Sequence, residues 1–516
     1  MAAAASFPFY CGCDYRADSS GAASPSPAPA PISPPRSGTD RLSSIASAAM
    51  ILRFPPNFAR QLSVKSRRNC SNIGVAQVVA ASAMSGQSSG GSSSIVDGVA
   101  AALSVGISVN GTAVKIDKAA EKPKPKSTST LAVHGGEREN GTKVADSLTT
   151  PIVQTATYTF RNTADLIAFQ DGTYKSFEYG RYGNPTTQAT ERKISALEGA
   201  EETLVSASGM CAATTMLLAL VPAGGHIVTT TDCYRRTRQF VQTVLPKMGI
   251  TTTVIDPADM ASLKRALDDN PVSLFFSESP TNPYLRCIDI ELVSTLCRRK
   301  GAIVCIDGTF ATPVNQKALA LGADLVLNSA TKYIAGHNDV LAGSISGSKP
   351  LVDTVRKLHN VLGGVVDAHA AYLIGRGLKT LDLRVRQQNS NALRLARALE
   401  SHPKIARVHY PGLESHPEFH IASKQMRGFG GVVSFEIDGD LALTSKFIDG
   451  LRIPYIAPSL GGCESLVEQP TIISYWDQSP AERAKMGIKD NLVRFSCGIE
   501  DYEDIYADVM QSLASL

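Results

Sequence analysis

Two apolar stretches of the sequence end in side chains that can carry charge or move a proton. Residues 301–310, GAIVCIDGTF, bring a carboxylate at Asp307 to the end of the first stretch, and residues 323–333, ADLVLNSATKY, bring an amine at Lys332 to the end of the second. The two residues are about as far apart in sequence as a strand, a helix and a second strand require. We therefore predict a carboxylate and a lysine at the ends of neighbouring strands.

Pyridoxal chemistry needs such a pair. A lysine forms an imine with an aldehyde, and an acid beside the pyridine nitrogen keeps the ring protonated as an electron sink. Upstream, residues 206–215, SASGMCAATT, open a helix with small residues, and its free N–H groups can bind a phosphate that Gly209 lets approach closely. Taken singly, a surface lysine and an ordinary helix cap explain these features as well.

The elements around these residues indicate an α/β fold. Short apolar runs alternate with helix-period segments such as 210–220 and 291–299. The runs cover 226–230, 272–276, 303–306 and 325–327. Alternating strands and helices predict a mostly parallel sheet covered by helices, with ligands beyond the carboxyl ends of its strands. A long helix at 384–399 and a strand at 431–437 then predict a smaller second domain.

The N-terminal part has the composition of a leader followed by a linker. It is rich in Ala, Ser and Pro, carries recurring Arg, and has only Asp14, Asp18 and Asp40 as acids before Asp97. A Ser- and Arg-rich, acid-poor start is typical of an organelle transit peptide, although a plain disordered tail would have a similar composition. We assign residues 1–82 to a transit peptide and N-terminal region, and the Ser/Gly- and Lys/Pro-rich residues 83–130 to a flexible linker.

Composition argues against several other classes of protein. The net charge is +4 over 516 residues, and the sequence has no dense Lys/Arg run with interleaved aromatics, so we expect no nucleic-acid partner. No apolar stretch approaches the roughly 20 residues that a membrane helix needs, so we expect no membrane span. His409, His416 and His420 lie close in sequence, but we expect an exposed loop and no metal, because no Cys or carboxylate is spaced to complete a site.

Several motifs in one order make the chain similar to a known family. They are YGRYGNPT (179–186), SGM (208–210), ESPTNP (278–283), DGTF (307–310), SATKY (329–333), SLGGCESL (459–466) and RFSCGIED (494–501). Over about residues 130–516 they resemble the Cys/Met-metabolism family of pyridoxal-phosphate enzymes. The resemblance implies the aspartate-aminotransferase type of fold (fold type I), with a mostly parallel cofactor domain and a smaller C-terminal α/β domain. We accordingly expect an N-terminal arm at 131–190, the cofactor domain at 191–375 and the C-terminal domain at 376–516.

The resemblance also implies a role for each residue of a cofactor site. Lys332 would be the Schiff-base lysine and proton shuttle, Asp307 would pair with the pyridine nitrogen, and Tyr234 would stack on the ring. The residues implied to bind the phosphate are Gly209, Met210, Ser329 and Thr331, with Tyr179 and Arg181 reaching it from a neighbouring subunit. Two positions depart from the family pattern: Gly308, where many relatives have Asn, and Pro458, where some have an acid.

The substrate site is implied in the same way. Arg494 would clamp the α-carboxylate, a bidentate contact that suits a guanidinium, and Ser459 would help to hold the lysine and the substrate. Arg235 and Arg236 follow Tyr234, where many relatives have small residues. We expect one of them, Arg236 in preference, to bind a leaving phosphate; the alternative is a solvated basic pair.

The implied reaction is a γ-replacement in methionine biosynthesis by transsulfuration, in which O-phosphohomoserine and L-cysteine give L-cystathionine. The implied assembly is a homotetramer of two catalytic dimers in the chloroplast stroma. Residues 67–82 resemble an N-terminal region of plant members whose nascent peptide feeds back on its own messenger, although ordinary transit-peptide sequence remains an alternative. Lyases that cleave cystathionine share the motifs and are the nearest alternative activity. The intact lysine, acid and phosphate site disfavour a non-catalytic member, and the lack of a G-x-G-x-x-G motif followed by an acid disfavours a dinucleotide oxidoreductase.

Overall fold

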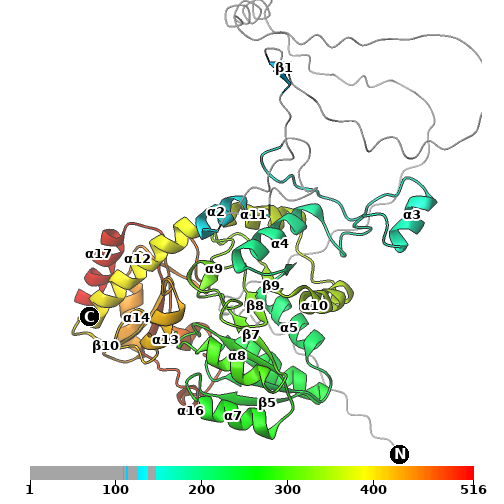
Figure 1. Ribbon diagram of the computed structural model, residues 1–516. Helices are drawn as coiled ribbons and strands as arrows, with labels where there is room; N and C mark the ends of the chain where they lie inside the picture. The colour runs from blue at the N-terminus through cyan, green and yellow to red at the C-terminus, as the bar shows by residue number, and fades with distance from the viewer. Residues whose placement is uncertain (1–107, 110–111, 114–125, 137–146) are drawn as a thin grey trace, which may run out of the picture. The chain divides into compact units, whose positions relative to one another are not determined.

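The computed structural model describes residues 108–109, 112–113, 126–136 and 147–516, which belong to two units divided after Val114 (Figure 1). In the first unit the described residues form one antiparallel pair, β1 (Ser108–Val109) with β2 (Thr112–Ala113). The predicted transit peptide and N-terminal region, 1–82, lie outside the described residues, and so does most of the predicted linker, 83–130.

The second unit, Lys115–Leu516, contains a seven-stranded sheet in the order β3–β9–β8–β7–β6–β4–β5. Its strands are β3 (Glu202–Ser206), β4 (His226–Thr230), β5 (Thr251–Ile255), β6 (Val272–Glu278), β7 (Ile303–Asp307), β8 (Leu325–Asn328) and β9 (Gly343–Gly347). Six strands run in one direction and β9 runs against them. The prediction of a mostly parallel sheet is therefore confirmed, and the four predicted strands correspond to β4, β6, β7 and β8.

Helices cover both faces of this sheet (Figure 1). Ile227 of β4 packs in a cluster with α5 (Gly209–Leu220) and α10 (Lys349–Leu362), whereas its neighbour Val228 packs with α7 (Met260–Asp269) and α8 (Ile290–Arg298). Successive strand residues point to opposite faces, so a strand that is buried on both faces must be apolar without interruption. That requirement explains the unbroken apolar runs of the sequence.

The C-terminal part forms a second sheet of five strands in the order β10–β11–β14–β13–β12. The strands are β10 (Ile405–His409), β11 (Val432–Ile437), β12 (Tyr455–Ile456), β13 (Leu466–Glu468) and β14 (Leu492–Ser496), and they are antiparallel except for the β12–β13 pair. The predicted helix 384–399 corresponds to α12 (Leu381–Glu400), and the predicted strand 431–437 corresponds to β11.

The remaining helices of the described residues range from 4 to 14 residues in length. They are α2 (Thr128–His134), α3 (Thr163–Gln170), α4 (Pro185–Glu198), α6 (Arg235–Gln239), η1 (Phe240–Val244), η2 (Leu245–Met248), α9 (Thr312–Asn315), α11 (Ala368–Leu378), α13 (Phe419–Gln425), α14 (Leu441–Asp449), α15 (Pro470–Ile473), α16 (Pro480–Lys485) and α17 (Tyr502–Ala514). Within the described residues, no helix is both long enough and apolar enough to cross a membrane.

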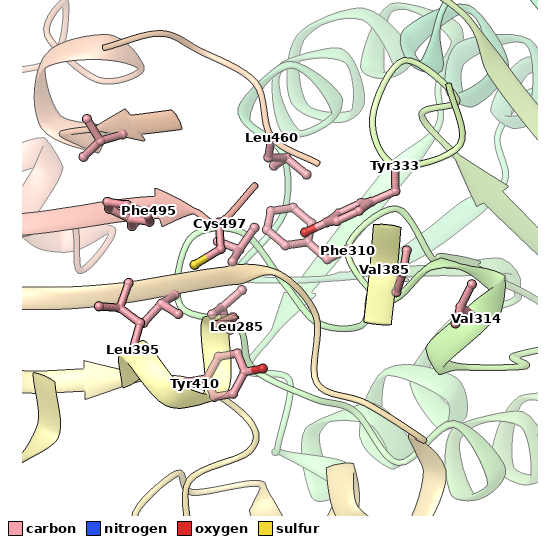
Figure 2. Packing of buried hydrophobic residues seen from close by; sticks show 14 of the residues in the cluster. Leu285, Phe310, Val314, Tyr333, Val385, Leu395, Tyr410, Leu460, Phe495 and Cys497 are labelled. Atoms are coloured by element: carbon pink, nitrogen blue, oxygen red, sulfur yellow. The ribbon is translucent and has the colours of Figure 1, made fainter. Parts of the chain in front are cut away.

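One hydrophobic cluster joins the two sheets (Figure 2). Phe310 and Tyr333, which follow strands of the seven-stranded sheet, pack in the same cluster as Phe495 and Leu460 of the C-terminal part. The Tyr333 ring is 1% exposed, and its hydroxyl accepts a hydrogen bond of 3.2 Å from the Gly431 backbone. Because Tyr333 follows Lys332 directly, this contact fixes the lysine-bearing turn against the second sheet.

Candidate functional site

A cavity of about 460 Å³ opens where the carboxyl ends of the parallel strands meet the second sheet. It contains most of the side chains that were predicted to form the site. Those lining it are Gly209, Met210, Tyr234, Arg236, Asp307, Ser329, Thr331, Lys332, Ser459 and Arg494. We call it the Lys332 cavity.

Lys332 lies in the turn after β8, and its amine is held in a defined place. Its Nζ donates a hydrogen bond of 2.6 Å to Oγ of Ser459. The pKa of Lys332 is lowered from its usual 10.5 to about 8, mainly by burial and also by the nearby Arg494 guanidinium, whereas Glu468 opposes the shift. Desolvation penalises the charged amine, so more of this lysine is neutral near physiological pH than of an ordinary lysine.

Asp307 ends β7, the strand that pairs in parallel with β8. Its Oδ1 accepts a hydrogen bond of 2.9 Å from the Thr309 backbone, and Oγ1 of Thr309 accepts one of 2.8 Å from the Ser329 backbone. Burial raises the pKa of Asp307 to about 6, while the Thr309 contacts lower it. The carboxyl group is therefore mostly ionised at neutral pH and sits in the same cavity as the lysine.

The amino end of α5 forms another part of the cavity wall, next to the turn that carries Lys332. Ser208 caps the helix by accepting a 3.0 Å hydrogen bond from the Cys211 backbone. A Cβ on Gly209 would lie 2.9 Å from Cβ of Ser329, so only glycine lets the helix start this close to the lysine-bearing turn. The hydroxyl of Thr331 donates to the Ala342 carbonyl at 3.2 Å and accepts from the Ala342 backbone at 2.9 Å, which engages its single proton.

Arg494 of β14 is 7% exposed and is held by three different elements. It forms an ion pair of 3.0 Å with Glu468, its partner across the β13–β14 ladder. It also donates 3.1 Å to Oδ1 of Asn282 and 2.9 Å to the carbonyl of Ser459. Ser459 has a φ of 108°, a strained conformation for a residue with a side chain. In that conformation its hydroxyl contacts Lys332 while its carbonyl contacts Arg494.

The two arginines beside Tyr234 differ in their contacts. Arg235 is held by the segment after α15. Its guanidinium donates to the Ser474 carbonyl, forms an ion pair of 2.5 Å with Asp477 and lies 5.6 Å from the Tyr475 ring centre. Arg236 is exposed and donates 2.9 Å to Gln239, one turn along the same helix. Both line the Lys332 cavity.

Tyr179 and Arg181 do not line the Lys332 cavity of their own chain. They line a second cavity of about 410 Å³, which we call the Arg181 cavity. The Arg181 guanidinium donates 2.6 Å to the Asn360 carbonyl and lies 5.5 Å from the ring centre of Tyr179 and 4.8 Å from that of Tyr182. Within one chain, these two residues therefore lie in a different cavity from the rest of the predicted site.

The expectation of an exposed histidine loop is wrong for His409 and His416, which are 7% and 4% exposed; His420 is exposed. Nε2 of His409 lies 3.0 Å from Oε1 of Glu436, and burial lowers the pKa of His416 to about 4. The carboxylate partner comes from β11, which the β10–β11 ladder brings alongside, so spacing along the sequence could not reveal it. No group of three metal-ligating side chains occurs among the described residues.

Sequence reasoning gave no role to several polar residues of the Lys332 cavity, among them Glu278, Asn282 and Glu468. Glu278 and Asn282 stand in the ESPTNP motif, which was recognised but not assigned a role, and Glu468 follows the SLGGCESL motif. The signal for Glu278 was present, since it ends an apolar run as Asp307 does. Glu468 carried no comparable signal, because only the strand register brings it beside Arg494.

The profile of one protein family, described as Cys/Met metabolism PLP-dependent enzyme, matches residues 129–514. The chain belongs to this family. Cystathionine gamma-synthase 1, chloroplastic, of Nicotiana tabacum is 60% identical over 510 residues, which cover 93% of this chain and 94% of the relative. The family predicted from the motifs is therefore confirmed.

Other members of the Cys/Met-metabolism family match over a shorter part of the chain. Cystathionine beta-lyase of Lactococcus lactis subsp. cremoris is 38% identical over 388 residues, 75% of this chain and 99% of the relative. The crystal structure of cystathionine gamma synthase from Xanthomonas oryzae pv. oryzae in complex with aminoacrylate and cysteine has a TM-score of 0.71 at 34% identity, and covers 76% of this chain and 98% of that one. The predicted fold class is confirmed with the family.

Membership makes the chain an enzyme that uses pyridoxal phosphate, and the Lys332 cavity fits this cofactor. It offers an amine with a lowered pKa, a half-buried carboxylate on the neighbouring strand, and a helix amino end that glycine brings close to a turn with two hydroxyls. These are the groups that an aldehyde, a pyridine nitrogen and a phosphate require.

Proposed function

We propose that this chain is a cystathionine γ-synthase, which joins an activated homoserine to L-cysteine and releases L-cystathionine. The observation that carries the proposal is the 60% identity to the tobacco enzyme of that name over 93% of the chain. The Lys332 cavity supports it, because it places an amine, a carboxylate and a guanidinium around one space. The cystathionine lyases are the alternative, and the lyase described above is less similar at 38%.

Within this proposal the cofactor is held by the seven-stranded sheet. Lys332 would bind it covalently, Asp307 would pair with the ring nitrogen, and Tyr234 would cover one face of the ring. The phosphate would lie at the start of α5, near Gly209, Met210, Ser329 and Thr331. When bound, pyridoxal phosphate supplies an electron sink that acidifies the carbon–hydrogen bonds of the amino acid.

The second sheet would hold the amino acid itself. Arg494 would bind the α-carboxylate, and its contacts with Glu468, Asn282 and Ser459 fix the direction of its guanidinium. Lys332 would then remove the Cα proton of the bound amino acid and return protons to other carbon atoms of the same amino acid. Its lowered pKa suits both tasks, since a lysine at about 8 can accept and donate a proton near neutral pH. The Ser459 hydroxyl, 2.6 Å from Nζ, would keep the amine aimed into the cavity.

We propose O-phosphohomoserine as the activated substrate and Arg236 as the residue that binds its leaving phosphate. Arg235 is already paired with Asp477 and the Ser474 carbonyl, whereas Arg236 contacts only a neutral amide of its own helix among the bonds that the structure describes for it. A guanidinium is a natural partner for a phosphate. This favours Arg236 over a purely solvated basic pair.

We also propose that each active site is shared between two subunits of a homotetramer built from two catalytic dimers. Tyr179 and Arg181 lie in the Arg181 cavity, away from Lys332 of the same chain. A dianionic phosphate needs a full positive charge, which a helix end and hydroxyls do not supply. Arg181 of a second subunit would supply it.

The remaining proposals concern the N-terminal part of the chain and the domain boundaries of residues 131–516. Relatives named chloroplastic, together with the acid-poor start, support import into the chloroplast, with residues 1–82 as the transit peptide and a regulatory-like region. We retain an arm at 131–190, a cofactor domain at 191–375 and a C-terminal domain at 376–516. The seven-stranded sheet lies within the second of these and the five-stranded sheet within the third.

One assay tests the activity. The purified chain is incubated with O-phosphohomoserine and L-cysteine, and L-cystathionine is quantified by mass spectrometry. A parallel incubation with L-cystathionine alone measures 2-oxo acid and ammonia, the products of a lyase. Cystathionine formation that exceeds lysis supports the proposal. Rapid lysis without net synthesis would make the chain a lyase of the same family.

A further inference from the structure

Glu278 is a buried carboxylate in the wall of the Lys332 cavity that the proposed reaction leaves without a role. It ends β6, is 4% exposed, and stands beside Asp307 in the parallel ladder of β6 and β7. Its own burial and the neighbouring Asp307 raise the pKa of Glu278, which means that the site keeps a carboxyl group here against an electrostatic cost. A buried carboxyl group of this kind needs hydrogen-bond donors that satisfy its oxygens.

Those partners are two backbone N–H groups from different loops. One oxygen of Glu278 accepts from the backbone of Tyr234, and the other accepts from the backbone of Asn282 at 3.0 Å. Tyr234 starts the short helix α6, and no side chain of that helix caps it. The carboxylate of Glu278 therefore replaces the missing cap and fixes the backbone that carries the Tyr234 ring.

The contact with Asn282 extends the chain of hydrogen bonds to the second sheet. The Asn282 backbone donates to Glu278, and its side-chain Oδ1 accepts from the Arg494 guanidinium at 3.1 Å. The same loop is attached to β11 by the Ser434 hydroxyl, which donates 2.6 Å to the Pro283 carbonyl. One carboxylate thus links the aromatic wall of the cavity to the arginine on its far side.

We propose that Glu278 is a positioning residue that fixes Tyr234 and Arg494 relative to each other. This inference rests on the proposed function for the assignment of Tyr234 to the cofactor ring and of Arg494 to the substrate carboxylate. A carboxylate is required because both of its oxygens must accept, whereas an amide can accept at only one end and presents hydrogen atoms at the other. Glu278 touches neither reacting group directly and acts through the two backbones.

The test uses Glu278→Gln in the holoenzyme, with L-2-aminobutyrate as the probe. This amino acid has a carboxylate for Arg494 but no γ-leaving group, and its dissociation constant is read from the visible absorption of the cofactor. We expect Glu278→Gln to raise that constant about tenfold, in line with the loss of one charged hydrogen bond. Because the probe is not turned over, the result does not depend on which reaction the enzyme catalyses.

Asp232→Asn is the matched control. Asp232 is a half-buried carboxylate that accepts from the Thr281 hydroxyl at 3.3 Å, so it contacts the same loop without touching Tyr234 or the Asn282 backbone. We expect its dissociation constant for L-2-aminobutyrate to stay within twofold of the unchanged enzyme. An equal loss in both variants would show a general loosening of the loop and would overturn the positioning role.

A double-mutant cycle completes the test. If Glu278 acts on Arg494 through Asn282, then the losses of affinity for L-2-aminobutyrate in Glu278→Gln and Asn282→Ala should combine to less than their sum in the double variant. Independent, additive losses would contradict the route through Asn282. A variant Glu278→Gln that binds the probe normally but shifts the pH dependence of the cofactor absorption would place its action on Asp307 instead, and would also overturn the proposal.

Discussion

The Lys332 cavity and the Arg181 cavity divide the predicted cofactor site between two places on one chain. The first contains an amine, a half-buried carboxylate and a helix amino end, and these groups can bind an aldehyde, a ring nitrogen and part of a phosphate. The second contains Tyr179 and Arg181, whose guanidinium lies 5.5 Å from the ring centre of Tyr179 and 4.8 Å from that of Tyr182. Neither cavity of a single chain contains both Lys332 and Arg181. If Arg181 of a second subunit completes the site as proposed, the unit of function is a pair of chains.

The largest effect is expected from removing the amine of the Lys332 cavity. Lys332→Ala should lower cystathionine formation by about 10⁴-fold, because one group is asked to bind the cofactor and to move protons. Borohydride reduction of the unchanged enzyme should attach the pyridoxyl group to the peptide that contains Lys332, as seen by mass spectrometry. Lys349→Ala, which changes an exposed lysine paired with Asp353, is the control and should keep activity within twofold. Label on another lysine would refute the assignment.

A smaller loss is expected at the Arg181 cavity. Arg181→Ala should raise the dissociation constant for pyridoxal phosphate by about 10- to 100-fold, the loss expected for a charged hydrogen bond to a phosphate. Equilibrium dialysis of the cofactor measures it. Arg161→Ala, which removes an exposed arginine of the same arm that pairs with Asp165, should bind the cofactor normally. Unchanged affinity in Arg181→Ala would mean that this cavity has no part in the cofactor site.

The leaving-group assignment predicts a loss of specificity. Arg236→Ala should lower kcat/KM for O-phosphohomoserine about tenfold and leave that for O-succinylhomoserine nearly unchanged, because only the first ester leaves as a phosphate. Arg235→Ala serves as the comparison, since Arg235 holds the segment around Asp477 and should affect both esters alike. Equal losses for both esters in Arg236→Ala would show that Arg236 does not select the leaving group and contributes only to the shape of the cavity.

The smallest expected effect is a change in the pH midpoint for covalent binding of the cofactor. In the cofactor-free protein, covalent binding of pyridoxal phosphate needs the neutral amine of Lys332. Its pKa is lowered to about 8, so the rate should rise with pH around a midpoint near 8 and not near the usual 10.5. Arg494→Met removes a positive charge that lowers this pKa and should move the midpoint upward. Stopped-flow absorbance at several pH values measures both midpoints, and a midpoint above 10 in the unchanged protein would contradict the buried position of the amine.

Sequence reasoning succeeded where a single strand decides the position of a side chain. Asp307 and Lys332 each follow an apolar run, and parallel strands bring such ends to one edge, so their meeting in one cavity could be predicted. Sequence reasoning was weaker where a contact depends on the alignment of two strands that are distant in sequence. The Glu468–Arg494 pair and the His409–Glu436 contact both depend on antiparallel register, which the sequence does not encode locally.

Hydrogen-bond partners were the least predictable feature. Thr331 was predicted as a phosphate ligand from its place beside Lys332, yet its hydroxyl is engaged on both sides by the Ala342 backbone. The strained φ of Ser459 likewise appears only in the folded chain, where the residue must serve Lys332 and Arg494 at once. Such contacts follow from tertiary packing, so residue type and spacing alone do not determine them.

Subunit complementation tests the division between the two cavities most directly. Arg181→Ala and Lys332→Ala chains, carrying different affinity tags, are co-expressed, and dimers that bear both tags are isolated and assayed for cystathionine formation. A shared site places both defects in one pocket of the mixed dimer and leaves the other intact, so activity should return to about half that of the unchanged enzyme. Mixed dimers as inactive as both parents would show that each chain completes its own site, and would contradict the account.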